Sequence, residues 1–337
     1  MAELLQVDTD AEWDALLEQQ PEASLFHTSA WLRLQQRFGG FDLFPLALRD
    51  AARCLGLLPV FTQRRGVFRV ASSPRGIDYV FLGPLVGPER LAELLDAYEA
   101  WAARGRIDYT SMALTREVAC EAARIRGWHC ERQRNHLVDL TGGEQAVLAR
   151  CHKDCREAIR KAQRHGVQII EGDLSGLADR YLELSARIFA KSQRRTRLTR
   201  GFLLDMLGTL QRCGRLLSLR AEVDGRLAGM YVAGHYGKTI YALDTVSDYA
   251  LARHSANTLM NWHLMRWGCR NGMEVFDLQG ANIPSIAAYK ASFGGGIVWY
   301  TNIQKAHGLA ARGAVWLRKA LAREFARLPR RLRRRPA

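Results

Sequence analysis

Four side chains in the C-terminal half are of the types that could transfer an acyl group to an amine. Lys290 stands in YKASFGG, Asp277 in VFDLQG, and Tyr241 and Asp244 in TIYALDTVS. Such a transfer needs a proton acceptor for the amine, positive charge or donors for the developing oxyanion, and both reactants held in line. We therefore expect Lys290 to bind an oxyanion or a phosphate. We expect the other three residues to position the amine or relay its proton.

Each of these residues also has a purely structural interpretation. Lys290 could cap the C-terminus of a helix. Tyr241 could be a core aromatic residue whose hydroxyl has a partner, and Asp277 could cap a turn. The sequence leaves these alternatives open. It shows no Ser-His-Asp arrangement and no metal-ligand spacing, so we expect no metal.

A second set of side chains could bind phosphate. Residues 144–165 predict one long helix with an apolar face and a basic face, and Lys153 and Arg156 lie on the basic face. Arg33 lies on another predicted helix, and Arg253 lies just before a third. We expect these four residues to bind substrate. The alternative is that they belong to ordinary solvated basic surfaces.

The elements around Lys290 would place it at the edge of a sheet. Residues 275–278 predict a buried strand, and residues 285–293 predict a short helix that Pro284 introduces. The glycines at 294–296 end that helix and permit positive φ. Lys290 therefore stands between two strand ends, where open α/β sheets tend to bind ligands.

The rest of the C-terminal half predicts two helices, a three-strand meander over residues 216–243 and an apolar helix over residues 255–271. The N-terminal half mixes helices and strands in a looser version of the same order. There, residues 136–140 predict a short strand. Residues 297–300 begin a strand at the end of the C-terminal half.

The motifs FDLQG, YKASFGG and HKDCREAIRKAQRHGV resemble those of the FemABX-type transferases, a branch of the GNAT acyltransferase superfamily that includes peptidoglycan-bridge aminoacyltransferases. The resemblance covers nearly the whole chain and is strongest from Asp139 to Ile303. It implies that Lys153 and Arg156 lie near the phosphates of a nucleotide-linked or lipid-linked precursor. We expect both residues to line the space between two domains.

The resemblance implies an α/β fold, with α+β mixed sheets, built from tandem GNAT-like domains. We expect an N-terminal GNAT-like domain at residues 1–140 and a C-terminal GNAT-like acyltransferase domain at residues 141–308. An amphipathic helix and a basic tail follow at residues 309–337. We also expect each domain to have a separate sheet.

The donor stays open at this point. GNAT proteins that use acetyl-CoA carry R/Q-x-x-G-x-G/A before the helix that binds the pyrophosphate, but this chain reads SDYALARHSAN there, without glycine. FemABX-type members also lack that motif and use aminoacyl-tRNA. Against this, the chain shows no inserted coiled-coil helices of the kind that some tRNA-dependent members carry, which favours acyl-CoA or an acyl carrier. We expect no permanently bound cofactor.

The composition supports a folded protein with anionic partners. The chain has 337 residues, a formal net charge of +15 and 48% hydrophobic residues. This length suggests two domains. The charge favours phosphates, nucleic acid or an anionic membrane face, unless it reflects only solvated arginines. The seven cysteines lack paired spacing, which indicates reduced core residues.

The N-terminus has no signal-peptide pattern, and no apolar run reaches the length of a membrane span. We therefore expect a cytoplasmic protein without a transmembrane segment. The basic tail could contact the inner membrane face peripherally, or it could be a disordered, solubilising end.

Together these features predict an acyltransferase that moves an acyl or aminoacyl group onto an amine of a cell-envelope or related precursor. Its partners would be a phosphate-bearing acceptor and, if the donor is aminoacyl-tRNA, charged tRNA. One alternative is a small-molecule N-acetyltransferase that uses acyl-CoA or an acyl carrier. The other is a non-catalytic protein that binds nucleic acid or an anionic polymer.

Overall fold

Each half of the chain runs through the same order of elements in the computed structural model, which describes residues 2–51, 53–73, 82–114, 120–191, 196 and 198–317. Three antiparallel strands are followed by a helix, a strand parallel to the third one, a second helix and a closing strand. This repetition confirms the predicted tandem GNAT-like architecture.

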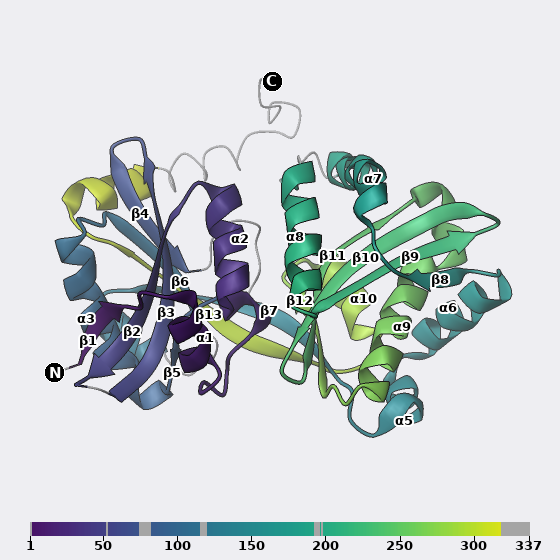
Figure 1. Cartoon of the computed structure of the whole chain (residues 1–337), viewed down its shortest axis with the longest axis horizontal. Coiled ribbons are helices and arrows are strands. Elements are labelled where there is room, and N and C mark those ends of the chain that lie inside the picture. The colour runs from purple at the N-terminus through teal and green to yellow at the C-terminus, as the bar shows by residue number, and fades with distance from the viewer. Residues whose placement is uncertain are drawn as a thin grey trace.

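The N-terminal half contains β1 (Glu3–Gln6), α1 (Asp10–Leu17), η1 (Leu25–His27), α2 (Ser29–Gly39), β2 (Asp42–Asp50), β3 (Arg53–Arg65), β4 (Phe68–Ser73), β5 (Leu85–Val86), η2 (Pro88–Arg90), α3 (Leu91–Arg104), β6 (Tyr109–Leu114), α4 (Cys120–Ile125) and β7 (His129–Asp139). The repeat is formed by β2, β3, β4, α3, β6, α4 and β7 (Figure 1).

The C-terminal half contains α5 (Gly143–Arg150), α6 (Lys153–Arg164), β8 (Gln168–Glu171), η4 (Ser175–Leu177), α7 (Ala178–Lys191), α8 (Arg200–Arg212), β9 (Leu216–Val223), β10 (Arg226–Tyr236), β11 (Thr239–Ser247), η5 (Tyr249–His254), α9 (Ala256–Arg270), β12 (Val275–Gly280), α10 (Pro284–Ala291) and β13 (Gly296–Ala306). The predicted meander is β9 to β11, and the second copy of the repeat is formed by β9, β10, β11, α9, β12, α10 and β13. A further helix covers residues 309–317.

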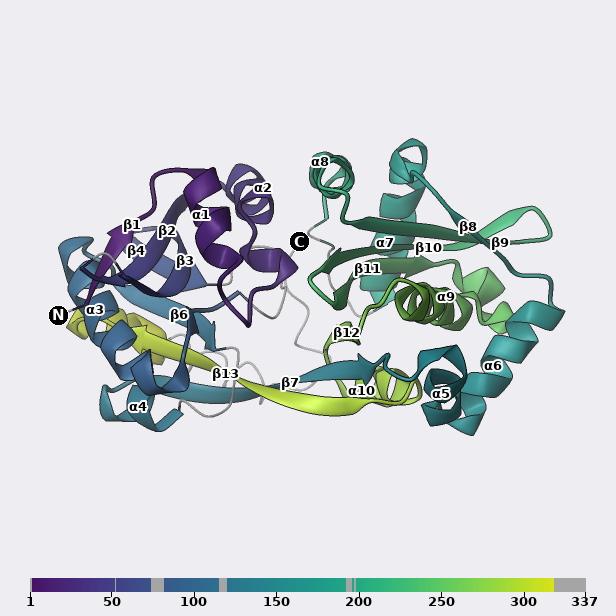
Figure 2. The same ribbon diagram turned by 60° about the horizontal axis from the view of Figure 1, so that its bottom comes forward.

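The closing strands are exchanged between the halves. β7 pairs with β12 of the C-terminal half, β13 pairs with β6 of the N-terminal half, and β7 and β13 pair with each other. The two long strands run side by side beneath both halves (Figure 2). Among the described residues all strands therefore belong to one hydrogen-bonded sheet, and the expectation of two separate sheets is wrong.

The length of these two strands explains that error. Each has 11 residues, far more than the segments 136–140 and 297–300 predict. The first part of β7 reads HCERQR, a charged sequence that lacks the apolar alternation of a half-buried strand. Backbone pairing with β13 holds it in the sheet instead.

The long helix predicted over residues 144–165 is also wrong, because the chain breaks between α5 and α6. Cys151 and His152 are extended there. The Cys151 thiol donates to the carbonyl of Phe293, and the His152 amide donates to the carbonyl of Ser292 at 2.9 Å. These bonds hold the extended residues between α5 and α6 against the end of α10. Tertiary contacts therefore override the helical periodicity of the sequence.

The two halves also meet through side chains on the opposite side of the molecule from β7 and β13. α2 faces α8 (Figure 2). Phe38 and Phe202 make an edge-to-face contact with ring centroids 5.5 Å apart, and Arg37 forms an ion pair with Asp205. One buried apolar cluster runs from α1 and α2 into α7, α8 and β11. No helix of the described part is long and apolar enough to cross a membrane.

Candidate functional site

The candidate site lies where β11 and β12 part. Their parallel pairing covers three positions and ends at Tyr241 and Asp277. A register shift interrupts the β10–β11 ladder near Leu243, and a second one interrupts the β12–β7 ladder between Asp277 and Gly280. Such bulges redirect side chains and end pairing, and they occur often beside active sites.

Asp277 is buried, with 2% of its surface exposed, and one of its carboxylate oxygens is held on two sides. Its Oδ1 accepts hydrogen bonds from the Asn135 side-chain amide at 2.8 Å and from the Gln279 backbone amide at 2.7 Å. The second bond is the turn-capping contact of the structural alternative. In the described structure Oδ2 has no such bond, so it can take a proton from a substrate.

Lys290 projects from α10 to the end of β12. Its Nζ donates to the carbonyl oxygens of Gln279 at 3.1 Å and Gly280 at 2.7 Å. Lys290 lies in the last turn of α10, as the helix-capping alternative requires, but its ammonium group contacts a strand end. An ammonium group has three donors, and two of them are directed by these carbonyls. The third can point to a substrate oxygen.

The Gly turn after α10 keeps Lys290 in place. Gly294 and Gly295 have φ of 80° and 78°, as the sequence predicts. A Cβ on Gly295 would lie 2.1 Å from the carbonyl oxygen of Leu137 in β7, so no larger residue fits. The ring of His136 donates from Nε2 to the carbonyl of Gly294 at 2.7 Å.

Burial moves the pKa values of Asp277 and Lys290 toward neutral pH. It raises the pKa of Asp277 to about 6, although hydrogen bonds and the charge of Lys290 oppose the shift. It lowers the pKa of Lys290 to about 8, against the charge of Asp277. Between these values the pair is an ionised acid and a protonated amine, the states that base and cation roles need.

A second carboxylate, that of the half-buried Asp244, lies on β11. Burial raises the pKa of Asp244 to about 6, and a hydrogen bond with Tyr181 of α7 opposes the shift. The Tyr231 hydroxyl donates to Asn261 at 3.1 Å, and burial together with the charges of Tyr289, Asp244 and Asp277 raises its pKa. The structure thus places Asp244 in the same electrostatic neighbourhood as Asp277.

Tyr241 has the surroundings of its structural alternative. It is buried, and its ring meets Phe26 edge to face at 5.1 Å. Its hydroxyl hydrogen bonds with the backbone of Leu25 and the side chain of Thr239, and burial raises its pKa. Its catalytic role stays a prediction.

The basic helix α6 does not line the space between the halves, which corrects that expectation. It lies at the outer end of the C-terminal half (Figure 1), because its apolar side packs on α9. Lys153 is 80% exposed and pairs with Glu157 at 3.8 Å. Arg156 donates to the carbonyl oxygens of Ala149 and Cys151, which caps α5. Substrate binding by these two residues stays a prediction.

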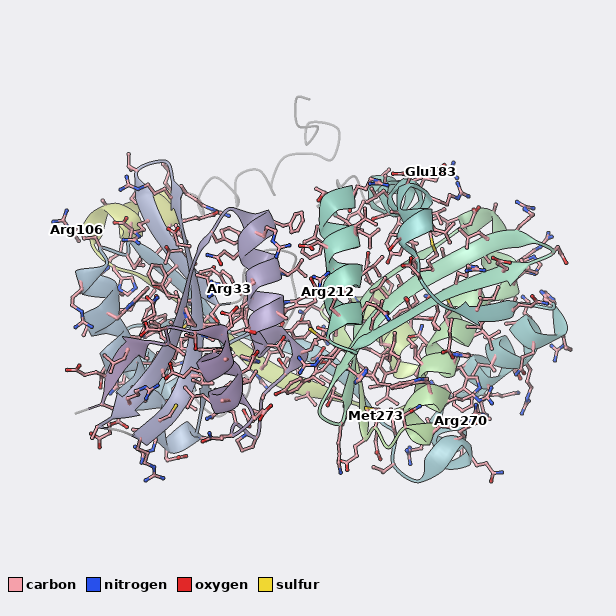
Figure 3. The ribbon with its side chains drawn as sticks, in the orientation of Figure 1. Arg33, Arg106, Glu183, Arg212, Arg270 and Met273 are labelled. Carbon is pink, nitrogen blue, oxygen red and sulfur yellow. The ribbon has the colours of Figure 1, made fainter. Side chains whose placement is uncertain are left out.

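The other two basic residues make their described contacts with groups other than Lys290. Arg33 of α2 (labelled in Figure 3) forms an ion pair with Asp10 at 2.7 Å, so its charge is already matched. Arg253 lies in η5, before α9, and its Nε donates to His254 at 3.1 Å. The structure therefore brings together Asp277, Lys290 and the β11 residues but not the four basic side chains.

Two residues at this site were not predicted from the sequence as site residues. Asn135 stands in the polar stretch RQRNH, where no sequence pattern distinguishes a buried side-chain amide from solvent-exposed polar side chains. Gln279 has a φ of 66°, which is rare for a residue with a side chain. Its place between an expected strand and Gly280 is the only sequence signal for a bend.

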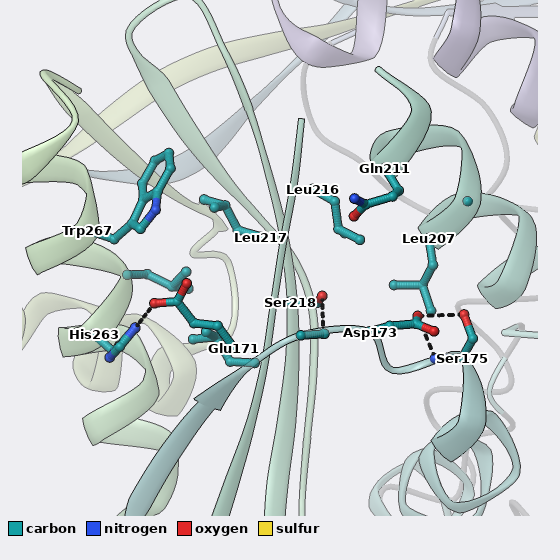
Figure 4. Close-up of a pocket in the computed structure, with 14 residues that line it drawn as sticks. Glu171, Asp173, Ser175, Leu207, Gln211, Leu216, Leu217, Ser218, His263 and Trp267 are labelled. Carbon is teal, nitrogen blue, oxygen red and sulfur yellow. Dashed lines mark hydrogen bonds and ion pairs between the residues drawn. The ribbon is translucent and has the colours of Figure 1, made fainter. Parts of the chain in front are cut away.

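A cavity of about 540 Å³ lies elsewhere, at the edge of the sheet beside β8 and β9. Its walls include Glu171, Gln211, Leu216, His263 and Trp267, and Glu171 pairs with His263 at 2.6 Å (Figure 4). It contains none of the eight predicted site residues. Its size alone gives no reason to place the chemistry there.

Residues 149–291 match the family described as Acetyltransferase (GNAT) domain. None of the curated proteins compared with the chain matches it in sequence. Among solved structures, FemX has a TM-score of 0.71 at 12% identity, with 89% of this chain and 96% of that chain covered.

Two further structures share the fold across almost their whole length. A tandem GNAT protein from the clavulanic acid biosynthesis pathway has a TM-score of 0.57 at 14% identity, with 92% of this chain and 99% of that chain covered. A C-terminal domain from Agrobacterium fabrum, described as that of a lysylphosphatidylglycerol synthetase, has a TM-score of 0.59 at 16% identity, with 91% and 96% covered. At these identities the likeness concerns the fold.

Proposed function

We propose that this chain, which carries a GNAT domain within a FemX-like fold, transfers an acyl or aminoacyl group to an amine at the parting of β11 and β12. The observation that carries the proposal is the pair of Asp277 and Lys290. Their pKa values of about 6 and about 8 keep a base and a cation available together at neutral pH.

In the proposed reaction the acceptor amine enters as an ammonium ion and gives one proton to Asp277. The amine nitrogen then attacks the carbonyl carbon of the donor. The carbonyl oxygen becomes negative and accepts a hydrogen bond from Lys290 Nζ. The new C–N bond forms, the bond from carbon to the carrier oxygen or sulfur breaks, and the second amine proton goes to that leaving atom.

The acceptor we propose is an amine of a cell-envelope or related precursor. The fold shared with FemX and with the domain described as lysylphosphatidylglycerol synthetase supports this choice. The donor we propose is an activated ester or thioester, the chemistry common to aminoacyl-tRNA, acyl-CoA and acyl carrier protein.

A donor screen tests the proposal. The full chain is incubated with labelled aminoacyl-tRNAs, acyl-CoAs and acyl carrier proteins and a panel of amines, and amide products are measured by mass spectrometry. The expected result is transfer from one donor class, at a rate that Asp277→Asn lowers by about 10³. Binding of several donors without turnover would instead favour the non-catalytic alternative.

A further inference from the structure

Three polar side-chain atoms next to Asp277 are buried without a hydrogen-bond partner. They are Oδ1 of Asn135 and both Oε1 and Nε2 of Gln279. Asn135 is fully buried, and Gln279 is 9% exposed. A buried polar atom without a partner is costly, so native structures contain few of them. These atoms therefore require an explanation.

The backbone at Gln279 is as unusual as its side chain. Its φ of 66° is a conformation that glycine adopts at no steric cost. It lies within the register shift of β12 against β7, where Gly280 pairs with Asn135. A glycine there would remove both the strain and the buried amide. Strained residues of this kind concentrate at ligand and catalytic sites.

Hydrogen bonds to one carboxylate oxygen bring the Asn135 side chain and the Gln279 backbone together. The Asn135 side-chain amide and the Gln279 backbone amide both donate to Oδ1 of Asp277, at 2.8 Å and 2.7 Å. The Gln279 carbonyl accepts from Lys290 at 3.1 Å. The unpartnered atoms therefore lie on residues that contact the proposed base and the proposed cation directly.

We infer that Asn135 and Gln279 form the acceptor subsite and select a primary ammonium group, an inference that rests on the proposed function. The ammonium has three N–H donors. Oδ1 of Asn135, Oε1 of Gln279 and Oδ2 of Asp277 supply three acceptors for them. Nε2 of Gln279 then remains as a second hydrogen-bond donor, in addition to Lys290, for the carbonyl oxygen of the acyl donor. A hydroxyl has one donor and a quaternary ammonium has none, so neither satisfies the three acceptors.

Binding of small amines tests the inference without any turnover. Ligand-observed NMR measures n-butylammonium, n-butyltrimethylammonium and n-butanol on the full chain. We expect n-butylammonium to bind at least about tenfold more tightly than the other two, because n-butyltrimethylammonium loses all three hydrogen bonds and n-butanol loses two of them. Equal binding of n-butylammonium and n-butyltrimethylammonium would overturn the inference.

Gln279→Gly separates binding from structure. It should weaken n-butylammonium binding at least about tenfold, while relief of strain raises the Tm by about 2 °C. Arg106→Gly is the matched control. It also removes a positive φ (49°), but at an exposed position at the far end of the N-terminal half (Figure 3). It should raise the Tm similarly and leave amine binding unchanged.

Asn135→Ala gives an independent arm, with the same expected loss of amine binding. Once a donor is known, both site variants should raise the KM for the amine at least about tenfold, and Asn135→Ala should leave the KM for the acyl donor unchanged. A lower Tm for Gln279→Gly with unchanged amine binding would show a structural role and overturn the inference. If no donor supports turnover but the amine binding pattern holds, the proposed function fails and the subsite stands.

Discussion

The two parallel strand pairs of this molecule have the same topology but different chemistry. β6 and β12 each have six residues, and each lies parallel to the third strand of its meander. The third residue of β12 is Asp277, and the third residue of β6 is Ser111. Asp277 is a buried carboxylate whose pKa is raised, whereas Ser111 is a half-buried hydroxyl residue.

The neighbouring ladders differ in the same way. β13 pairs with β6 in continuous register, but β7 pairs with β12 through a bulge that contains the positive φ of Gln279. Regular pairing leaves few backbone groups for a ligand, whereas a bulge frees and redirects them. The repeat thus supplies the framework in both halves, and the irregular copy carries the candidate site.

The largest expected effect comes from removing the base. Asp277→Asn keeps an oxygen for Asn135 and for the Gln279 amide but cannot accept a proton. We expect kcat to fall by about 10³, within the range of general-base contributions. Steady-state kinetics with the donor found in the screen measure it. The matched change in the other half, Ser111→Ala, should leave kcat unchanged. An equal loss in both variants would break the comparison.

Removing the cation should have the next largest effect. Lys290→Ala should lower kcat by about 10²–10³, the typical loss of an oxyanion donor. The Tm should hardly change, because the group is only partly buried. Lys290→Arg should rescue part of the rate, since a planar guanidinium does not reproduce a point charge.

The pH profile sharpens that prediction. Wild-type kcat/KM should rise through about pH 6 as Asp277 ionises and fall above about pH 8 as Lys290 loses its proton. Lys290→Arg should keep the acid limb and lose the alkaline one, because arginine stays protonated. Full activity of Lys290→Ala with the correct donor would exclude the lysine from the reaction.

The smallest effect concerns stability. The pKa of Asp277 is raised to about 6 from 3.8, so the folded state holds this proton more tightly than the unfolded state. Its contribution to stability is therefore present below about pH 4 and is lost as the pH rises to about 6. The loss should be about 3 kcal/mol. Urea unfolding of wild type and Asp277→Asn at several pH values measures the difference. A constant difference would mean that the carboxyl is not buried in solution.

Local sequence patterns predict the tandem repeat and the elements around Lys290. Meander, helix and strand patterns depend on local periodicity and turn residues, and both can be read directly from the sequence. The glycines after Lys290 require positive φ, and the structure has it at Gly294 and Gly295. Asp277 and Lys290 could be proposed as catalytic residues from the sequence alone, because their residue types and their positions near predicted strand ends are evident there.

The way in which the halves join, and the groups that come into contact, depend on tertiary structure and have no local sequence signal. The exchange of β7 and β13 depends on pairing between residues far apart in sequence. The charged residues in β7 also lack the apolar alternation that would predict a long strand. The break between α5 and α6 exists because Phe293 and Ser292 supply partners for Cys151 and His152. The buried amide of Asn135 becomes significant only because β7 brings it to Asp277, a contact that no local pattern encodes.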